Sequence, residues 1–215
     1  MRPLFALLAV LSLSLVSAAS PATVRVEYSN PGITPSSWTL VLHPDGSGHF
    51  TSNPGAASKT DMEVPAIDRP IQLDQAFVQK VFVVASSHTV MTGTCESHEK
   101  VAFQGWKTIT YEDGGTSSSC KFNYSKDKQI QSISEALLGV ATTIIEGQRL
   151  EMLLLHDPLG LDKEMGFLVD ASADGRVRQI CAIRTILQQL QANQSVMERV
   201  RKRAQILLIK AQKGY

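Results

Sequence analysis

The hydrophobic period of the chain changes near residue 126, and this change most limits the folds that the sequence can adopt. Before it, apolar and polar residues alternate, as in Val24, Val26 and Tyr28, which is the two-residue period of a half-buried strand. After it, apolar residues recur at every third or fourth position, which places them on one face of a helix. The sequence therefore predicts a sheet followed by a helical region.

The first part of the chain is expected to be an antiparallel sheet of about five strands with one packed helix, an α+β arrangement. Asp45-Gly46 lies between two β-prone runs and predicts a hairpin. Asp74 is placed to cap a helix, and Leu73 and Val78 have the spacing of a hydrophobic staple. Strands are expected around 24–28, 38–42, 49–51, 101–103, 107–112 and 117–124, and a long surface connection over 52–70.

The second part is expected to be a C-terminal helical subdomain with three breaks. Asp157 precedes a proline, which disfavours the helical conformation and ends the first helix. Asp174-Gly175 ends the next one, although Phe167–Ile180 also fits a hairpin across that pair. Ser195 and Glu198 have the spacing of a capping box at the start of the last helix. Helices are expected over 130–154, 162–173, 177–191 and 195–210, with the third break at 192–194.

The N-terminus has the layout of a secretory signal peptide. Arg2 supplies a positive charge, Leu4–Val16 is an apolar run, and Ser17-Ala18-Ala19 offers small residues for cleavage. The apolar run is too short to span about 30 Å of hydrocarbon as a helix, although an uncleaved anchor or a buried helix remains an alternative. We expect a signal peptide over 1–19, a sheet domain over 20–125 and a helical region over 126–215 that packs on or beside the sheet. The expected location is the periplasm or the medium, with no later transmembrane segment.

The three cysteines predict one disulfide. Cys95 and Cys120 lie in polar surroundings on either side of a predicted strand, whereas Cys181 lies among apolar residues and is expected to be a buried thiol. Closing the loop between the first two would stabilise an exported chain by about 3.5 kcal/mol. A zinc site made of these two cysteines and His98 is the alternative, but it lacks a fourth ligand.

The charge balance argues against a nucleic-acid partner. The formal net charge is +1 and becomes neutral once Arg2 is removed, so the chain has no excess of cations for binding phosphates. The basic residues of the last predicted helix are expected to form a solvated face, with a docking site for an anionic surface as the alternative. These residues are Arg199, Arg201, Lys202, Arg203 and Lys210.

The nine residues from His156 to Glu164 are the main candidate for chemistry. They contain four possible metal ligands or proton carriers, namely His156, Asp157, Asp162 and Glu164. Asp157 also has a structural role in ending a helix, and Asp162 is placed to cap the next one. The structural interpretation is therefore preferred, and His156 and Glu164 are the two residues that it explains least.

The order of elements and one later motif together carry a resemblance to other proteins. A strand at 38–42, a turn at 44–46, a helix at 73–86 and a strand at 108–111 follow one another, and Arg149–Glu151 leads into His156–Glu164. This arrangement resembles a family of exported bacterial hypothetical proteins of the Acidobacteria type. The resemblance covers most of the chain after the signal peptide. It implies an extracytoplasmic bacterial protein and implies no activity.

Two classes of function follow from these observations. The sequence contains no G-x-S-x-G, G-x-G-x-x-G, Walker or H-E-x-x-H pattern, so hydrolase, nucleotide and zincin chemistry lack their usual motifs and no cofactor is expected. The preferred hypothesis is an exported, non-enzymatic module that binds a protein or a cell-envelope component through its sheet or helical face. The alternative is a metal-dependent hydrolase centred on His156, Asp157, Asp162 and Glu164.

Overall fold

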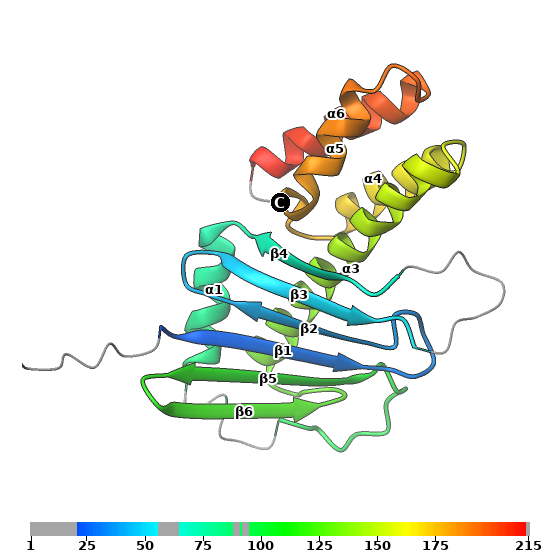
Figure 1. Ribbon diagram of the computed structural model, residues 1–215. Helices are drawn as coiled ribbons and strands as arrows, with labels where there is room; N and C mark the ends of the chain where they lie inside the picture. Colours follow the sequence, from blue (N-terminus) through cyan, green and yellow to red (C-terminus); the bar gives the residue numbers. More distant parts are fainter. Residues whose placement is uncertain (1–20, 56–64, 88–90, 92–94, 214–215) are drawn as a thin grey trace, which may run out of the picture.

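A computed structural model of the protein describes residues 21–55, 65–87, 91 and 95–213. It shows the predicted α+β class, with an antiparallel sheet built from the first part of the chain and helices built from the second (Figure 1). The predicted signal peptide over 1–19 lies outside the described residues. Within the described part of the chain, no helix is both long and apolar enough to cross a bilayer.

Six antiparallel strands form one sheet in the order β4-β3-β2-β1-β5-β6. Along β1, buried side chains alternate with exposed ones, which is the period read from the sequence. The hairpin at Asp45-Gly46 joins β2 to β3 as predicted. The strands are β1 (Thr23–Ser29), β2 (Ser37–Leu42), β3 (Ser47–Asn53), β4 (Asp68–Gln72), β5 (Trp106–Asp113) and β6 (Thr116–Phe122).

The sheet differs from the prediction in two places. β4 lies within and just beyond the expected surface connection, and it contains Pro70. Proline lacks an amide proton and is tolerated in an edge strand, which is where β4 lies. The strand predicted around Val101–Phe103 is wrong, because these residues have no regular structure and both apolar side chains are exposed. Their alternation therefore marked no buried face.

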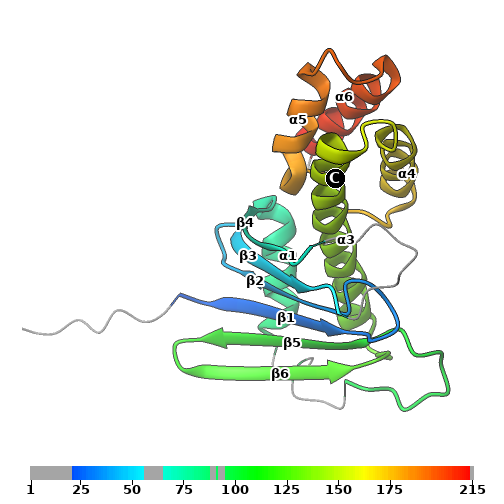
Figure 2. The same ribbon diagram turned by 45° about the vertical axis from the view of Figure 1, so that its right-hand side comes forward.

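Helices α1 (Gln75–Ala85) and α3 (Lys128–His156) cover one face of the sheet (Figure 2). Asp74 caps α1 as predicted, since its Oδ1 accepts a hydrogen bond from the Phe77 amide at 3.0 Å. Asp127 caps α3 in the same way. Within the described residues no helix covers the opposite face of the sheet, which carries the exposed side chains of Arg25 and Glu27.

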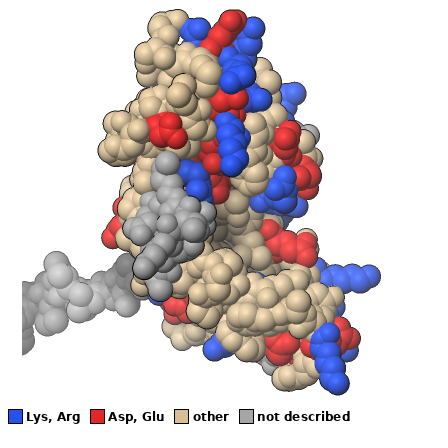
Figure 3. Space-filling view, turned by 90° about the vertical axis from the view of Figure 1, so that its right-hand side faces the viewer, with Lys and Arg blue, Asp and Glu red and all other residues tan. Residues whose placement is uncertain are grey.

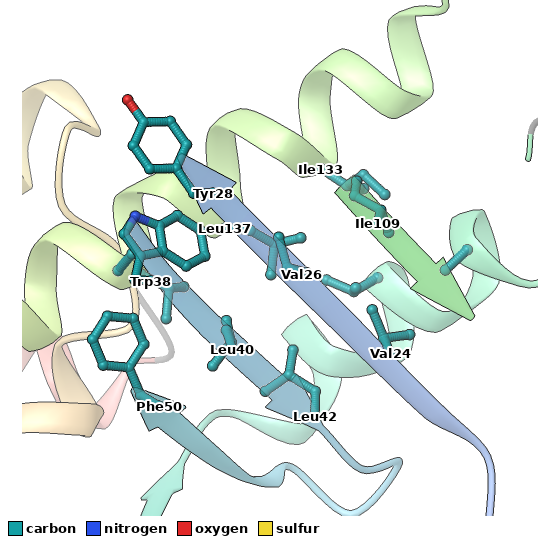
Figure 4. Close-up of a cluster of buried hydrophobic side chains, with 14 of the residues drawn as sticks. Val24, Val26, Tyr28, Trp38, Leu40, Leu42, Phe50, Ile109, Ile133 and Leu137 are labelled. Atoms are coloured by element: carbon teal, nitrogen blue, oxygen red, sulfur yellow. The ribbon is translucent and has the colours of Figure 1, made fainter. Parts of the chain in front are cut away.

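The core between the sheet and its helices is built around a row of aromatic rings (Figure 4). Trp38 stacks on Tyr28 with ring centroids 5.3 Å apart, and Phe50 lies 5.9 Å from Trp38 on its other side. Leu137 from α3 belongs to the same cluster and is fully buried. Burying each large apolar side chain contributes about 1.5–3 kcal/mol, so this layer is the main source of stability for the sheet.

Helix α3 is 29 residues long and belongs to two hydrophobic cores. Its residues from Ile130 to Ile145 pack with the sheet and α1, and we call this part of the molecule the sheet lobe. Leu150 and Leu153 pack instead with the C-terminal helices, which together form the helical lobe. The four residues between the cores, Glu146–Arg149, are called the waist of α3.

The helical lobe contains the four elements that follow α3. Gly175, with a φ of 83°, ends α4 at the Asp174-Gly175 pair, so the hairpin alternative over Phe167–Ile180 is wrong. The helix predicted from residue 177 starts later, as a short 3₁₀ segment. Ser195 does not cap the last helix, because its hydroxyl hydrogen-bonds to Asn193 instead. The elements are α4 (Leu161–Asp174), η1 (Ile180–Ile183), α5 (Arg184–Ala192) and α6 (Glu198–Gln212).

The connection from α4 to η1 lies tightly against α3. The Thr143 hydroxyl accepts a hydrogen bond from the Arg178 amide at 3.0 Å and donates to the Arg178 carbonyl at 2.6 Å. At the waist, a Cβ on Gly147 would lie 2.3 Å from Cγ2 of Ile183. A side chain there would push η1 away, so glycine is what permits this close approach.

Cys95 and Cys120 form a disulfide, as predicted, with their Cα atoms 5.7 Å apart. The bond uses both sulfurs that the alternative zinc site requires. It links the segment before β5 to β6, at the edge of the sheet. Cys181 is not disulfide-bonded, and burial raises the pKa of its thiol.

Candidate functional site: the waist of helix α3

The four residues singled out between His156 and Glu164 point to different partners. His156 and Asp157 are exposed at the end of α3, where Asp157 accepts hydrogen bonds from the Gly160 amide through its carbonyl and its carboxylate. Asp162 binds two arginines, and Glu164 contacts Glu146. Among the residues that the structure describes, no three His, Cys, Asp or Glu side chains are grouped so as to hold a metal ion.

Asp162 ties α4 to α6 and does not cap its own helix, which corrects the prediction. The N-cap of α4 is Gly160, which makes no side-chain hydrogen bond. Asp162 Oδ1 lies 2.6 Å from Arg199 Nε and 2.6 Å from Arg203 Nη1. Two residues of the basic face predicted for the last helix are therefore paired. Figure 3 shows acidic and basic side chains alternating along this side of the molecule.

Glu146, Arg149 and Glu164 form a second cluster at the waist. Glu146 and Arg149 are three residues apart on one face of α3, and Arg149 Nε lies 2.9 Å from Glu146 Oε2. Glu164 comes from the first turn of α4, which the Asp157–Gly160 turn folds back against α3. Its Oε2 lies 3.9 Å from Arg149 Nε. The cluster thus joins two acids to one base.

The two acids lie in surroundings that disfavour two negative charges. The Glu146 and Glu164 side chains are 12% and 17% exposed. Burial raises the pKa of Glu146 to about 8, and hydrogen bonding and repulsion from Glu164 act in the same direction, while Arg149 opposes them. At neutral pH Glu146 is therefore protonated and hydrogen-bonded to Glu164. The pair then carries one negative charge, which Arg149 balances.

Arg149 uses only part of its guanidinium group within the cluster. Its Nε donates to Glu146, and neither Nη nitrogen has a hydrogen-bond partner among the described residues. The side chain is 28% exposed, so the two Nη groups are open to solvent on one side. A guanidinium that is fixed at Nε and open at Nη presents a fork of donors to a planar anion.

A cleft of about 220 Å³ lies beside this cluster, between α3 and the connection from β1 to β2. Its wall is about half polar and half apolar, and Arg149 lies beside the apolar part, which has the character of a surface that binds hydrocarbon groups. Trp38 and Tyr28 also line the cleft. Both side chains are nearly buried and their rings stack on each other, so little of either ring face is open to a ligand. The lining residues are Tyr28, Ile33, Thr34, Pro35, Trp38, Leu138, Ala141, Thr142, Ile145, Glu146 and Arg149.

A third ionic contact lies on the opposite face of α3 and uses both Nη nitrogens of its arginine. Arg69 of β4 binds both carboxylate oxygens of Glu151, from Nη1 at 3.0 Å and from Nη2 at 2.7 Å. Its Nη2 also donates to Gln148 at 2.7 Å. This arrangement connects the edge strand to α3 and leaves neither Nη nitrogen without a partner.

Sequence reasoning found only one member of the waist cluster, Glu164. Glu146 and Arg149 have the spacing of an ordinary ion pair on a helix surface, so their spacing alone predicts no site. One signal was present. Four polar residues interrupt an otherwise apolar stretch of α3, where a helix joining two hydrophobic cores should be apolar on both faces. These residues are Glu146, Gln148, Arg149 and Glu151.

A scan against protein-family models finds no match for the chain, and a search of curated proteins finds none either. The function of the chain has to be inferred from the chemistry of its site.

Proposed function

We propose that the protein is an exported, non-enzymatic binding module and that its ligand occupies the waist cleft. The observation that carries this proposal is the open side of Arg149. Arg69, which holds β4 against α3, uses both of its Nη nitrogens on protein acceptors. Arg149 instead keeps both Nη groups without a partner among the described residues, beside a cleft.

The content of the cleft favours binding over catalysis. No serine, cysteine or histidine lines its described walls, and the hydroxyls of Thr142 and Tyr28 donate to the Leu138 and Gln104 carbonyls instead of to a base. The two acids share a proton with each other, and Arg149 balances the remaining charge. The metal-dependent hydrolase hypothesis is less favoured, because Asp162 and Glu164 are already engaged by Arg203 and Glu146.

The size of the cleft limits the ligand. Sites for drug-sized molecules have volumes of about 300–1,000 Å³, which exceeds the 220 Å³ of the cleft. The ligand is therefore a small molecule, or a single group carried by a protein or by a component of the cell envelope.

Two observations support export. The first residues have the layout of a signal peptide, and the disulfide between Cys95 and Cys120 is typical of oxidising compartments outside the cytoplasm. Expression of the full chain in a bacterium with a periplasm tests this point. We expect processed protein in the periplasm or medium, with an N-terminus at or near Ser20, whereas unprocessed protein in the cytoplasm would contradict export.

Blocking the cleft tests the binding proposal. Thr142→Phe places a ring among the lining residues, and Thr110→Phe, on the open face of the sheet, is the matched control. Amide NMR spectra of both variants and the original protein are recorded with small-molecule and peptide fractions of an envelope extract. We expect shifts at cleft residues in the original protein and the control, and none in Thr142→Phe. Shifts that persist in the blocked variant would place the ligand elsewhere.

A further inference from the structure

We infer that the ligand of the waist cleft is a small carboxylate with an apolar tail, held by the two Nη groups of Arg149. This inference rests on the proposed binding function and names the chemical class of ligand for the same site. It joins three features of the described residues: the open fork of Arg149, the apolar part of the cleft wall and the shared proton of the acid pair.

The fork of Arg149 is suited to a carboxylate because both are planar. Two parallel N–H···O bonds to one carboxylate form when a guanidinium group presents adjacent donors. Glu146 fixes Nε of Arg149 at 2.9 Å, so the guanidinium group is oriented before a ligand arrives. An arginine that is already ordered loses less conformational entropy on binding.

The rest of the cleft suits a short hydrocarbon group. Ile33, Pro35 and Leu138 line it, and Ile145 comes from the turn of α3 just before Glu146. A polar or charged tail that lies against these four side chains would lose its hydration there, whereas an apolar tail would not. The carboxylate would therefore lie at Arg149 and the tail along the apolar wall.

The protonation of the acid pair determines whether an anion is accepted. The charged groups that contact Glu146 are Arg149 on its own helix and Glu164 from α4. Tyr28 is the other titratable group among the cleft residues, and its hydroxyl donates to the Gln104 carbonyl. While Glu146 is protonated, the cluster of three is neutral. Once Glu146 ionises, the cluster carries one net negative charge and repels a carboxylate.

Carboxylate binding should therefore weaken as the pH rises through the pKa of Glu146, which is about 8. By linkage, a bound carboxylate should raise that pKa further. A cationic ligand would show the opposite pH dependence, since it would be attracted by the ionised pair. The sign of the pH effect thus separates the two ligand classes.

Three probes of similar length test the ligand class: hexanoate, hexan-1-ol and hexylammonium. Binding to the purified protein is followed by amide NMR at about pH 6.5 and pH 9. We expect hexanoate to shift cleft residues most strongly at the lower pH and to bind about tenfold more weakly at the higher pH. Glu146→Gln keeps a donor toward Glu164 and cannot ionise, so it should bind hexanoate equally at both pH values.

Arginine variants test the contact itself. Arg149→Gln should lose hexanoate binding, whereas Arg69→Gln removes the same charge from the opposite face of α3 and should keep it. If Arg149→Gln does not fold, Arg149→Lys retains the charge without the fork and should bind about tenfold more weakly.

The outcomes separate the ligand class from the binding function. If hexan-1-ol or hexylammonium fills the cleft as well as hexanoate, the carboxylate inference is wrong and the binding module stands. Hexanoate binding that does not depend on pH, or that survives in Arg149→Gln, also overturns the inference. If no probe shifts any cleft residue in the original protein or in Glu146→Gln, the cleft is not a site for such ligands and both proposals fail.

Discussion

Arg69 comes from β4 and Arg149 from α3, and they make their contacts on opposite faces of the same stretch of α3. Their side chains are equally exposed, at 28% each. Arg69 binds both oxygens of Glu151 and the side chain of Gln148, so both of its Nη groups are used. Arg149 binds one oxygen of Glu146 through Nε and leaves its Nη groups open. Equal exposure with such different use of donors indicates that the two arginines have different roles.

The difference extends to the acids that the two arginines meet. Arg69 faces one carboxylate and one side-chain amide, whose oxygens accept its Nη hydrogen bonds and so hold β4 against α3. Arg149 faces two glutamates that lie close enough to share a proton, and this arrangement destabilises the ionised form of the pair. Natural sequences keep an unfavourable cluster in a cleft mainly where it serves binding or chemistry. The waist therefore has one side whose contacts hold β4 against α3 and one side that we propose binds a ligand.

The largest expected effect comes from removing the structural arginine. Arg69→Ala breaks three hydrogen bonds to charged or polar partners and leaves Glu151 partly buried without a counter-ion, so the free energy of unfolding should fall by about 2 kcal/mol. Arg149→Ala removes one hydrogen bond and the cation that balances the acid pair, but the remaining charge is still stabilised by the proton that the two glutamates share, so the loss should be smaller, at about 1 kcal/mol. Urea denaturation of both variants at pH 7 measures the difference. Equal losses would show that the two arginines are equivalent.

The next effect is the pH dependence of stability that Glu146 contributes. Between its ordinary pKa of 4.5 and the folded-state pKa of about 8, the unfolded chain releases this proton and the folded chain keeps it. Rising pH therefore favours unfolding in that window, by up to about 1.4 kcal/mol per pH unit, and the slope ends above pH 8. Glu146→Gln removes this contribution.

The measurement for Glu146→Gln is a series of denaturation curves from about pH 5 to pH 9. The free energy of unfolding of the variant should fall less steeply than that of the original protein, and the variant should be the more stable of the two near pH 9. Parallel curves would mean that Glu146 has an ordinary pKa in the folded protein. Glu112→Gln, at an exposed position in β5, is a control that should leave the slope unchanged.

The smallest effect concerns the charges of the helical lobe. Arg199 is 63% exposed and shares Asp162 with Arg203, so Arg199→Ala should change the free energy of unfolding by no more than about 0.5 kcal/mol. High salt should remove even this difference, because exposed pairs are screened. A loss as large as that of Arg69→Ala would show that an exposed pair within the helical lobe stabilises the protein as much as the bidentate contact between β4 and α3.

Periodicity predicted most of the fold because most elements bury one face. β1, β2 and α3 were recognised by their apolar spacing, and Asp74 by its position before a helix. Periodicity failed where a strand does not bury every second side chain. β4 has one buried residue, Ile71, beside a proline and two charged residues, and it is held by its neighbour in the sheet.

The candidate site was largely hidden from the sequence because it is made by contact between distant segments. Glu164 lies 18 positions from Glu146 along the chain, and only the turn at Asp157–Gly160 brings them together. The sequence predicted that turn correctly but not which side chains it would join. Nor does spacing along the chain reveal that Arg149 keeps open donors, since this depends on what surrounds the guanidinium group.

The pKa of Glu146 tests the account most directly, because the shared proton distinguishes the Arg149 side of the waist from the Arg69 side. Carbon-13 NMR of the glutamate carboxyl groups, with Glu146→Gln used to assign its signal, gives this value in the intact protein. We predict that the Glu146 carboxyl titrates at about 8. Titration near the ordinary value of 4.5 would contradict the shared proton and the pH-dependent binding site built on it.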